Sequence, residues 1–388
     1  MNVTDSIRYV GVNDRKIDLF EGHYVVPDGI SYNSYVILDE KIAVMDSVGE
    51  DYAGEWLENI RLATGGKAPD YLIIQHMEPD HSRNLHRFME TYPEAKIVAS
   101  PKAWAMMKAF NGSDYAGRSI NACEGDALDL GSRSLQFITA PMVHWPEVIM
   151  TYDPKDRVLF SADAFGTFGT PEREDPQGWV SEARRYYIGI VGKYGAQVQA
   201  VIKKAAALDI GIICALHGPV LKEDLGFYLN KYDLWSSYGA ESEGVAIFYT
   251  SVYGHTKEAA FKLEKLLKEG GCSEVEAFDL ARTDWSEAVA QAFRYGRAVL
   301  ATTTYNGDIF PNMRSFLDCL KERLWQNRRV GFIENGSWGP IAARKMKDAL
   351  ANLKNLEFVE PTVTIRSALN EASEEQLKAL ADALLGND

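Results

Sequence analysis

The sequence predicts two parts, a strand-rich α+β part followed by an α/β part built on a doubly wound parallel sheet. Three observations lead to this prediction. The chain has 388 residues, more than one domain usually contains. Short apolar runs separated by polar turns fill residues 1–242, whereas strands and helices alternate strictly over residues 243–388. We therefore expect two domains, with the boundary after residue 242.

The composition argues against several classes of function. The net charge of −14 and the sequence pI of about 5.1 argue against nucleic acid or an anionic membrane as a partner. No apolar run is long enough for a membrane-spanning helix, and the first residues lack the apolar core of a signal peptide, so we expect a cytoplasmic protein. The four cysteines lie far apart without a CxxC pair, which gives no support for an iron–sulfur centre, a zinc ribbon or a dithiol redox site.

The first part begins with a predicted hairpin, formed by residues 29–38 and 42–46 around a short polar turn. Residues 51–62 have helical spacing, which predicts a helix. Further on, Ser82 is placed to cap another helix. The apolar face of that helix would carry Leu85, Phe88 and Met89.

A cluster of potential metal ligands follows the apolar run Tyr71–Ile74, which is predicted to be a buried strand. Four donors stand within six residues: His76, Glu78, Asp80 and His81. Pro79 lies among them, and because proline is unfavourable inside a helix or a central strand, we expect these ligands to lie on a loop. Closely spaced donors of this kind are costly to keep without a bound cation, so the segment predicts a metal site.

Three more donors follow later strands. His144, Asp163 and His217 come after the apolar runs at 135–140, 158–162 and 210–216. Each residue alone is more often a surface histidine or a turn former. Because the strand ends of one sheet lie on one rim, however, we expect all seven donors to converge on two metal ions, with Asp163 between them. Nitrogen and oxygen donors without thiolate suit iron or manganese as well as zinc, and the extra negative charge of Glu78 favours a redox metal.

Five strand–helix units fill the second part. Strands are predicted at residues 245–249, 274–280, 298–303, 329–334 and 358–365. Helices are predicted at residues 257–269, 285–295, 311–325, 340–353 and 373–385. Pro340 is expected to open the fourth helix, and Ser373 is expected to cap the fifth. Five such units in about 145 residues fit a five-stranded flavodoxin-like domain.

Three loops at strand ends predict a cofactor site, because ligands of doubly wound sheets bind at the carboxyl ends of the strands. The first loop leads into a helix N-terminus and carries hydroxyls but no lysine or arginine, which suits the single phosphate of FMN and disfavours nucleoside triphosphate hydrolysis. Aromatic side chains on the other two loops could flank a flat isoalloxazine ring. The candidate FMN-binding residues are Thr250, Ser251, Val252, Tyr253, Gly254, His255, Thr256, Thr303, Thr304, Tyr305, Asn306, Gly307, Asn335, Gly336, Ser337, Trp338 and Gly339.

The metal ligands also resemble those of a known fold family. His-x-Glu-x-Asp-His with the three later donors is similar to the metallo-β-lactamase motif, in which a histidine stands at the position of Glu78. The glutamate variant joined to a flavodoxin-like part resembles the flavodiiron proteins, or A-type flavoproteins, over nearly the whole chain. This resemblance implies an αββα metallo-β-lactamase-like sandwich for residues 1–242. It also implies that one iron is held by His76, Glu78 and His144, the other by Asp80, His81 and His217, with Asp163 bridging.

The same resemblance implies an oxidoreductase that uses FMN and two irons per chain to reduce O2 to water, NO to N2O, or both. It further implies a head-to-tail homodimer or a dimer of dimers. Since the sequence has no rubredoxin-type cysteine module, we expect an external electron donor, either a rubredoxin-like protein or reduced F420. Tyr194 resembles a tyrosine of the family that donates a proton or hydrogen bond near the irons, although a packed tyrosine is an equally good interpretation; His23 is a weaker candidate.

Two other functions stay open from the residues alone. One is a hydrolase of the metallo-β-lactamase type, in which a metal-activated hydroxide attacks an ester. The flavodoxin-like part would then have no purpose. The other is a flavin electron carrier with a non-catalytic metal domain, which the intact set of seven ligands opposes.

Overall fold

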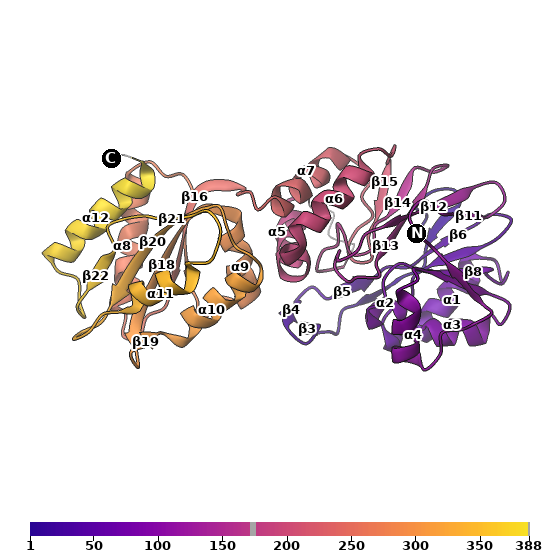
Figure 1. The fold of residues 1–388 in the computed structure, drawn as a ribbon, viewed down its shortest axis with the longest axis horizontal. Helices are drawn as coiled ribbons and strands as arrows, with labels where there is room; N and C mark the ends of the chain where they lie inside the picture. Colours follow the sequence, from indigo (N-terminus) through magenta and orange to yellow (C-terminus); the bar gives the residue numbers. More distant parts are fainter. Residues whose placement is uncertain (171–175, 387–388) are drawn as a thin grey trace. The chain divides into compact units, whose positions relative to one another are not determined.

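The computed structural model describes residues 1–170 and 176–386. The chain divides into two compact units, Met1–Asp233 and Leu234–Asp388, shown in Figure 1. The division falls inside helix α7 (Leu225–Ser236), ahead of the change of sequence pattern at residue 242. The segment before that change is bonded into the second unit: the amide of Glu241 donates to the carbonyl of Arg294 (2.8 Å), and Arg328 donates to the carbonyl of Tyr238 (2.9 Å).

Two mixed sheets form the centre of the first unit. The six-stranded sheet has the order β1-β6-β7-β8-β9-β10, and the five-stranded sheet runs from β11 to β15 in sequence order. Their strands are β1 (Ile7–Tyr9), β6 (Tyr35–Ile37), β7 (Ala43–Met45), β8 (Tyr71–Ile74), β9 (Lys96–Ala99), β10 (Ser119–Asn121), β11 (Ala127–Asp129), β12 (Ser134–Thr139), β13 (Ile149–Asp153), β14 (Val158–Phe160) and β15 (Ile212–Cys214). One apolar core contains residues of both sheets, among them Met45, Ile73, Phe137 and Phe160.

Helices cover the outer sides of these sheets, which gives the αββα sandwich that the resemblance implies. In Figure 1, α1, α3 and α4 gather on one side of the first sheet, and α5, α6 and α7 lie beside the second. The helical segments are η1 (Glu50–Tyr52), α1 (Ala53–Ala63), α2 (Pro79–Ser82), α3 (Leu85–Thr91), α4 (Ala103–Asn111), α5 (Pro176–Tyr186), η2 (Tyr187–Val191), η3 (Gly192–Tyr194) and α6 (Gly195–Ala205). Two small pairs complete the unit: β2 (Val12–Asp14) with β5 (Ile30–Tyr32), and β3 (Leu19–Phe20) with β4 (Tyr24–Val25).

The local prediction for the metal segment was partly wrong. Pro79 does not hold the ligands on a loop; it occupies the first position of the short helix α2, where a missing N–H costs nothing. Ser82 ends that helix instead of capping the next, because its hydroxyl donates to the carbonyls of Met77 (2.8 Å) and Glu78 (3.0 Å). The three apolar residues predicted on α3 are buried as expected.

The second unit is a doubly wound parallel sheet. Its strand order β17-β16-β18-β20-β21 places the first strand between the second and the third, as in flavodoxins. The strands are β16 (Ser242–Tyr249), β17 (Val275–Asp279), β18 (Tyr295–Tyr305), β19 (Asp308–Ile309), β20 (Arg328–Asn335), β21 (Leu356–Phe358) and β22 (Val363–Ile365). The helices are α8 (His255–Glu269), α9 (Trp285–Arg294), α10 (Pro311–Glu322), α11 (Ala342–Leu350) and α12 (Glu371–Leu385).

Three details of the second unit differ from the prediction. The strand expected at residues 358–365 is two strands, β21 and β22, and both pair with β20. Pro340 lies before α11, and the amides of Ile341 and Ala342 at the start of that helix donate to the side chain of Thr304 at the end of β18. Asn370 caps α12 and Ser373 is its reciprocal partner, because an asparagine side chain accepts the Ser373 amide while the Ser373 hydroxyl accepts the amide of Asn370.

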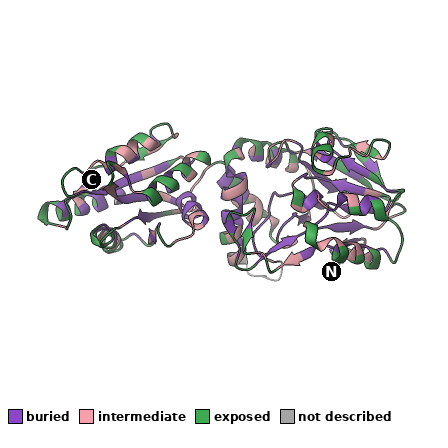
Figure 2. Cartoon of the chain, turned by 90° about the horizontal axis from the view of Figure 1, so that it is seen from below, coloured by how far each residue is buried: buried purple, intermediate pink, exposed green. Residues whose placement is uncertain are grey.

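Buried residues concentrate in the strands and on the inner sides of the helices, as Figure 2 shows. No helix among the described residues combines the length and the apolar character needed to cross a membrane.

Candidate metal centre and cofactor cavity

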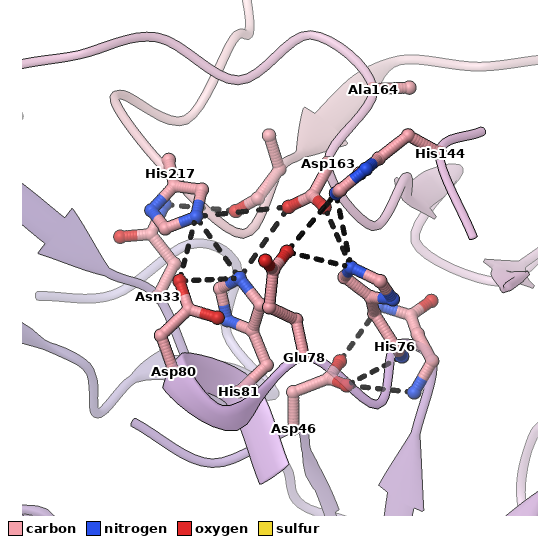
Figure 3. A network of polar contacts seen from close by, with 12 residues as sticks. Asn33, Asp46, His76, Glu78, Asp80, His81, His144, Asp163, Ala164 and His217 are labelled. Atoms are coloured by element: carbon pink, nitrogen blue, oxygen red, sulfur yellow. Dashed lines mark hydrogen bonds and ion pairs between the residues drawn. The ribbon is translucent and has the colours of Figure 1, made fainter. Parts of the chain in front are cut away.

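The structure brings all seven predicted metal donors together in the first unit (Figure 3). His76 and Glu78 follow strand β8 and the next two donors lie on α2, so these four come from the six-stranded sheet and its connection. His144, Asp163 and His217 follow β12, β14 and β15 of the five-stranded sheet. The expectation that one sheet supplies every donor was therefore wrong: the site lies where strand ends of two packed sheets meet.

The first group of donors consists of His76, Glu78, His144 and Asp163. The Nε2 atom of His76 lies 3.2 Å from Glu78 Oε2, 3.3 Å from His144 Nε2 and 3.2 Å from Asp163 Oδ2. His144 Nε2 in turn lies 3.1 Å from Glu78 Oε2 and 3.2 Å from Asp163 Oδ2. Donor atoms that each bond one ion at about 2.1 Å stand about 3 Å from one another, so these separations match a shared ion.

The second group consists of Asp80, His81 and His217. The two Nε2 atoms lie 3.0 Å apart, and each is 3.3 Å from Asp80 Oδ2. Asp163 also faces this group, but with its other oxygen: Oδ1 is 3.5 Å from His81 Nε2 and 3.8 Å from that of His217. One carboxylate thus presents one oxygen to each group, which is the geometry of a bridging ligand.

The electrostatics of the site require cations. Burial raises the pKa of a carboxyl, but His76 and His144 hold the pKa of Asp163 well below its usual value. Burial lowers the pKa of an imidazole, yet Asp163, Glu147 and Glu78 raise the pKa of His76 well above its usual value. For His144 the carboxylates Asp163 and Glu78 outweigh burial and raise the pKa to about 9. Anionic oxygens concentrated in a buried site stabilise positive charge, either as protons or as metal ions.

Two further features fit metal ions better than protons. Paired imidazole nitrogens point at each other at 3.0 and 3.3 Å, where two N–H groups would repel. Both oxygens of Asp80 and Oδ1 of Asp163 are buried without a hydrogen-bond partner among the described residues. Buried polar atoms without a partner are costly, and metal coordination would satisfy them.

A second candidate site is a cavity of about 480 Å³ in the second unit, at the carboxyl ends of β16, β18, β20 and β22. This volume lies within the range of small-molecule and cofactor sites. Its lining residues are Ser251, Val252, Tyr253, His255, Thr256, Thr303, Thr304, Tyr305, Asn306, Gly307, Asn335, Gly336, Ser337, Trp338, Gly339 and Ser367. The lining contains no lysine or arginine, as the sequence predicts for its first loop.

The predicted cofactor residues and this lining agree with three differences. Thr250 is buried against the hydroxyl of Thr302 (2.6 Å) and does not line the cavity. Gly254 does not line it either; it has φ of 99° at the start of α8, a conformation that favours glycine. Ser367, at the end of β22, is a lining residue that sequence reasoning missed, because the signal of its short strand was merged with that of β21.

Several lining side chains form hydrogen bonds to the backbone of neighbouring segments. The Asn335 side chain accepts a hydrogen bond from the Ser367 amide (3.0 Å) and donates one to the Ser367 carbonyl (2.9 Å). These bonds fix the loop after β22 to the loop after β20. The Thr304 hydroxyl accepts the amides that begin α11. The large aromatic side chains at the cavity are left exposed: Tyr253 by 90%, Trp338 by 93% and Tyr305 by 45%. Flat rings open to solvent around a cavity suit a flat aromatic ligand.

Comparison with known proteins gives the same picture. Residues 30–218 match the model of the ODP family beta lactamase. An uncharacterized protein of Methanocaldococcus jannaschii is 30% identical over 96% of this chain and 94% of its own length. The nitric oxide reductase of Moorella thermoacetica is 29% identical over 94% of this chain and 92% of its own.

Solved structures match across both units. Rubredoxin oxygen:oxidoreductase from Desulfovibrio gigas has a TM-score of 0.92 and 25% identity, covering 100% of this chain and 98% of that one. The flavodiiron protein from Giardia intestinalis has a TM-score of 0.89 and 25% identity, covering 99% and 95%. The chain belongs to the flavodiiron protein family.

Within this flavodiiron chain, the metal-facing side chains have partners that the sequence did not reveal. Asp46 accepts the amides of Gln75 (2.7 Å) and His76 (3.4 Å), which anchors the start of the ligand segment, and burial raises the pKa of Asp46 to about 6. Nδ1 of His76 bonds Glu147, and Nδ1 of His217 bonds the carbonyl of Ser31. Of these partners, only Glu147 could have been suspected from the sequence, since it stands three residues after the predicted donor His144.

A tyrosine that the sequence did not single out, Tyr186, packs beside the metal donor His217. Tyr186 is buried, its ring centroid lies 5.6 Å from that of His217, and burial together with nearby Asp163 raises its pKa well above the usual value. Tyr194 is half-buried at the end of η3. His23 is exposed at the tip of the β3–β4 hairpin, its ring beside that of Tyr24.

Apolar rings close the second group of donors on one side. The ring of Phe20 lies 5.2 Å from His217 and that of Tyr32 lies 6.0 Å from it, and Phe168 packs against both Phe20 and Tyr186. These side chains come from β3, β5, α5 and the segment after β14. An aromatic wall of this kind favours small apolar molecules over water next to the donors.

Proposed function

We propose that this chain is an FMN- and di-iron-dependent oxidoreductase that reduces O2 to water, NO to N2O, or both. The observation that carries the proposal is the pair of donor groups that share Asp163, in a chain that also has a flavodoxin-type cavity. Relatives named nitric oxide reductase and rubredoxin oxygen:oxidoreductase support the two substrates.

In this proposal His76, Glu78 and His144 hold one iron, Asp80, His81 and His217 hold the other, and Asp163 bridges them. The donor set contains no thiolate, and hard oxygen donors with imidazoles suit iron. Glu78 adds a negative charge where a histidine would be neutral, which stabilises the higher oxidation state of the metal. A zinc hydrolase gains nothing from that charge or from a flavodoxin-type unit.

The FMN phosphate would lie at the N-terminus of α8, beside the hydroxyls of Ser251 and Thr256, where partial positive charge compensates for the absence of lysine and arginine. The isoalloxazine ring would lie between the loops that carry Tyr305 and Trp338. Asn335 contributes through the loop position that it fixes.

When bound, two irons and one FMN supply the four electrons that convert O2 and four protons to two waters, or the two electrons that convert two NO and two protons to N2O and water. The protein's own part is to hold the metal donors in place and to exclude water from them. Buried carboxylates fix the donor atoms and their charge, and the Nδ1–H groups of His76 and His217 are held by their acceptors so that each Nε2 points inward. The aromatic wall beside His217 limits water.

The proposal also includes the partners of this activity. The name of the Desulfovibrio gigas relative supports a rubredoxin-like protein as electron donor, with reduced F420 as the other candidate. A head-to-tail homodimer, or a dimer of dimers, would cover the exposed aromatic side chains at the cavity and bring the flavin of one chain to the irons of another.

The proposal is tested by purifying the protein without oxygen and measuring iron, zinc and flavin per chain, followed by reduction and assay with each gas. One FMN and two irons per chain, with consumption of O2 or NO, would support it. Zinc with ester hydrolysis and no gas consumption would overturn it, as would flavin without metal.

A further inference from the structure

Glu147 is a buried carboxylate that contacts the metal segment without being a metal donor. It is 2% exposed and lies in the loop after β12, three residues beyond His144. Its Oε1 atom accepts two hydrogen bonds, from Nδ1 of His76 and from the backbone amide of Met77, each at 2.8 Å. One side chain therefore ties the loop that carries His144 to the segment that carries His76.

The bond to Glu147 decides which nitrogen of His76 faces the other donors. A carboxylate oxygen only accepts, so Nδ1 carries a hydrogen. In the neutral imidazole that binds a metal, the lone pair is then on Nε2, which faces Glu78, His144 and Asp163. His217 has the corresponding arrangement, but its Nδ1 donates to the backbone carbonyl of Ser31 at 2.7 Å. The two donor groups thus differ: an anionic acceptor supports the first and a neutral acceptor supports the second.

An anionic acceptor affects the strength of metal binding and the preferred oxidation state of the metal, as well as the orientation of the His76 ring. It raises the electron density of the imidazole, which strengthens the metal–nitrogen bond and favours the more highly charged metal ion. Its negative charge is close to the first metal position and is buried, so solvent screens it little.

We propose that Glu147 is a positioning residue that strengthens metal binding at the position of His76, Glu78 and His144 and lowers the reduction potential there, so that the two irons are unequal. This inference rests on the proposed di-iron function. It assigns to Glu147 no contact with substrate, and its effect is transmitted through His76.

The decisive variant is Glu147→Gln, which keeps an oxygen able to accept both hydrogen bonds and removes the charge. Glu147→Ala removes the accepting oxygen as well as the charge. The matched control is Glu124→Gln: Glu124 also accepts a backbone amide, that of Thr139 at 2.8 Å, but it is exposed and touches no metal donor. All variants are tested as the full chain with its flavin.

Two measurements are made on each protein. Metal content is followed during competition with a chelator of graded concentration, and the reduction potential of the metal pair is followed by an anaerobic titration read by EPR. Glu147→Gln should release one of its two metals at about 10- to 100-fold lower chelator concentration, leave the other unchanged, and raise the potential. Glu124→Gln should match the wild type in both measurements.

Wild-type affinity and potential in Glu147→Gln would overturn the inference, even if Glu147→Ala loses metal, because the role would then be structural. If Glu147→Ala does not fold, Glu147→Gln decides alone. A failure of the proposed function looks different, since the wild-type protein itself would then hold zinc or no metal. The chelator competition still reports on Glu147 with zinc bound.

Discussion

The metal centre and the flavin cavity are built in opposite ways. The four histidines and Asp163 are buried and Glu78 and Asp80 are partly buried, and these donors are held by one another and by partners such as Asp46 and Glu147. The cavity of the second unit is open and carries no lysine or arginine, and it is built from strand-end loops with exposed aromatic side chains. A site for metal ions needs side chains fixed in advance, whereas a flat ring needs apolar surfaces and its phosphate can be bound by backbone amides and hydroxyls. Changes at one site should therefore leave the other intact.

The largest expected effect is that of Asp163→Asn. Asp163 presents one oxygen to each donor group, and a neutral amide cannot offer two anionic oxygens. We expect loss of both metals and of gas consumption, with FMN still bound, as measured by metal analysis and flavin absorbance. His81→Asn should instead lower the content of one metal. Two irons and full turnover in Asp163→Asn would contradict the bridging role.

The converse change is Trp338→Ala in the cavity. Removing an aromatic surface from one side of the flavin should weaken FMN binding about tenfold, or about 1.4 kcal/mol, while iron content stays at the wild-type level. Fluorescence titration of the flavin-free full chain measures this. Trp338→Phe keeps a flat ring and serves as the control. An unchanged affinity in both variants would place the ring elsewhere.

A smaller effect is expected at the tyrosine beside the second donor group. Tyr186→Phe removes a buried hydroxyl close to His217 and the carboxylates, and should slow turnover several-fold with iron and FMN unchanged. Tyr194→Phe is the matched comparison and should have no effect. If Tyr194→Phe slows the enzyme and Tyr186→Phe does not, the assignment from sequence is the better one.

The smallest effect is a pH dependence of stability. In protein stripped of metal, the folded pKa of His144 is about 9 against 6.5 when unfolded. Because the folded pKa is raised, the protonated imidazole stabilises the folded state, and this stabilisation is fully present below pH 6.5 and is lost as pH rises through 9. Thermal unfolding of the stripped protein should therefore occur at lower temperature toward pH 9.

Metal-loaded protein should not show that decline, because the metal takes the place of the proton on the imidazole nitrogens. The same decline with and without metal would mean that His144 is not a ligand. Flavin content is measured in the metal-stripped and the metal-loaded series, and it should be the same in both.

The sequence revealed the metal donors because each lies in the short segment or short helix that follows a strand, so the signal is local. It did not reveal that Pro79 opens a helix, since a proline at the first helical position and a proline on a loop look alike in a short segment. Nor could it find Tyr186 or the carbonyl of Ser31, because these meet the donors only through the packing of separate elements.

In the second unit, the doubly wound parallel sheet and three loops that line the cavity followed from the alternation of strands and helices. Ser367 was missed because two short strands looked like one. Asn335 lines the cavity, and the sequence did not reveal that its side chain also binds the backbone of Ser367. Periodicity shows where an element lies, but not which side chains the loops use for themselves.

The most direct test of the central claim is one preparation assayed with both gases. Protein purified without oxygen, analysed for metal and flavin and then reduced, should contain two irons and one FMN per chain and should consume O2, NO or both with a single electron donor. Protein with full iron and flavin that consumes neither gas with any donor able to reduce its flavin would contradict the proposed function.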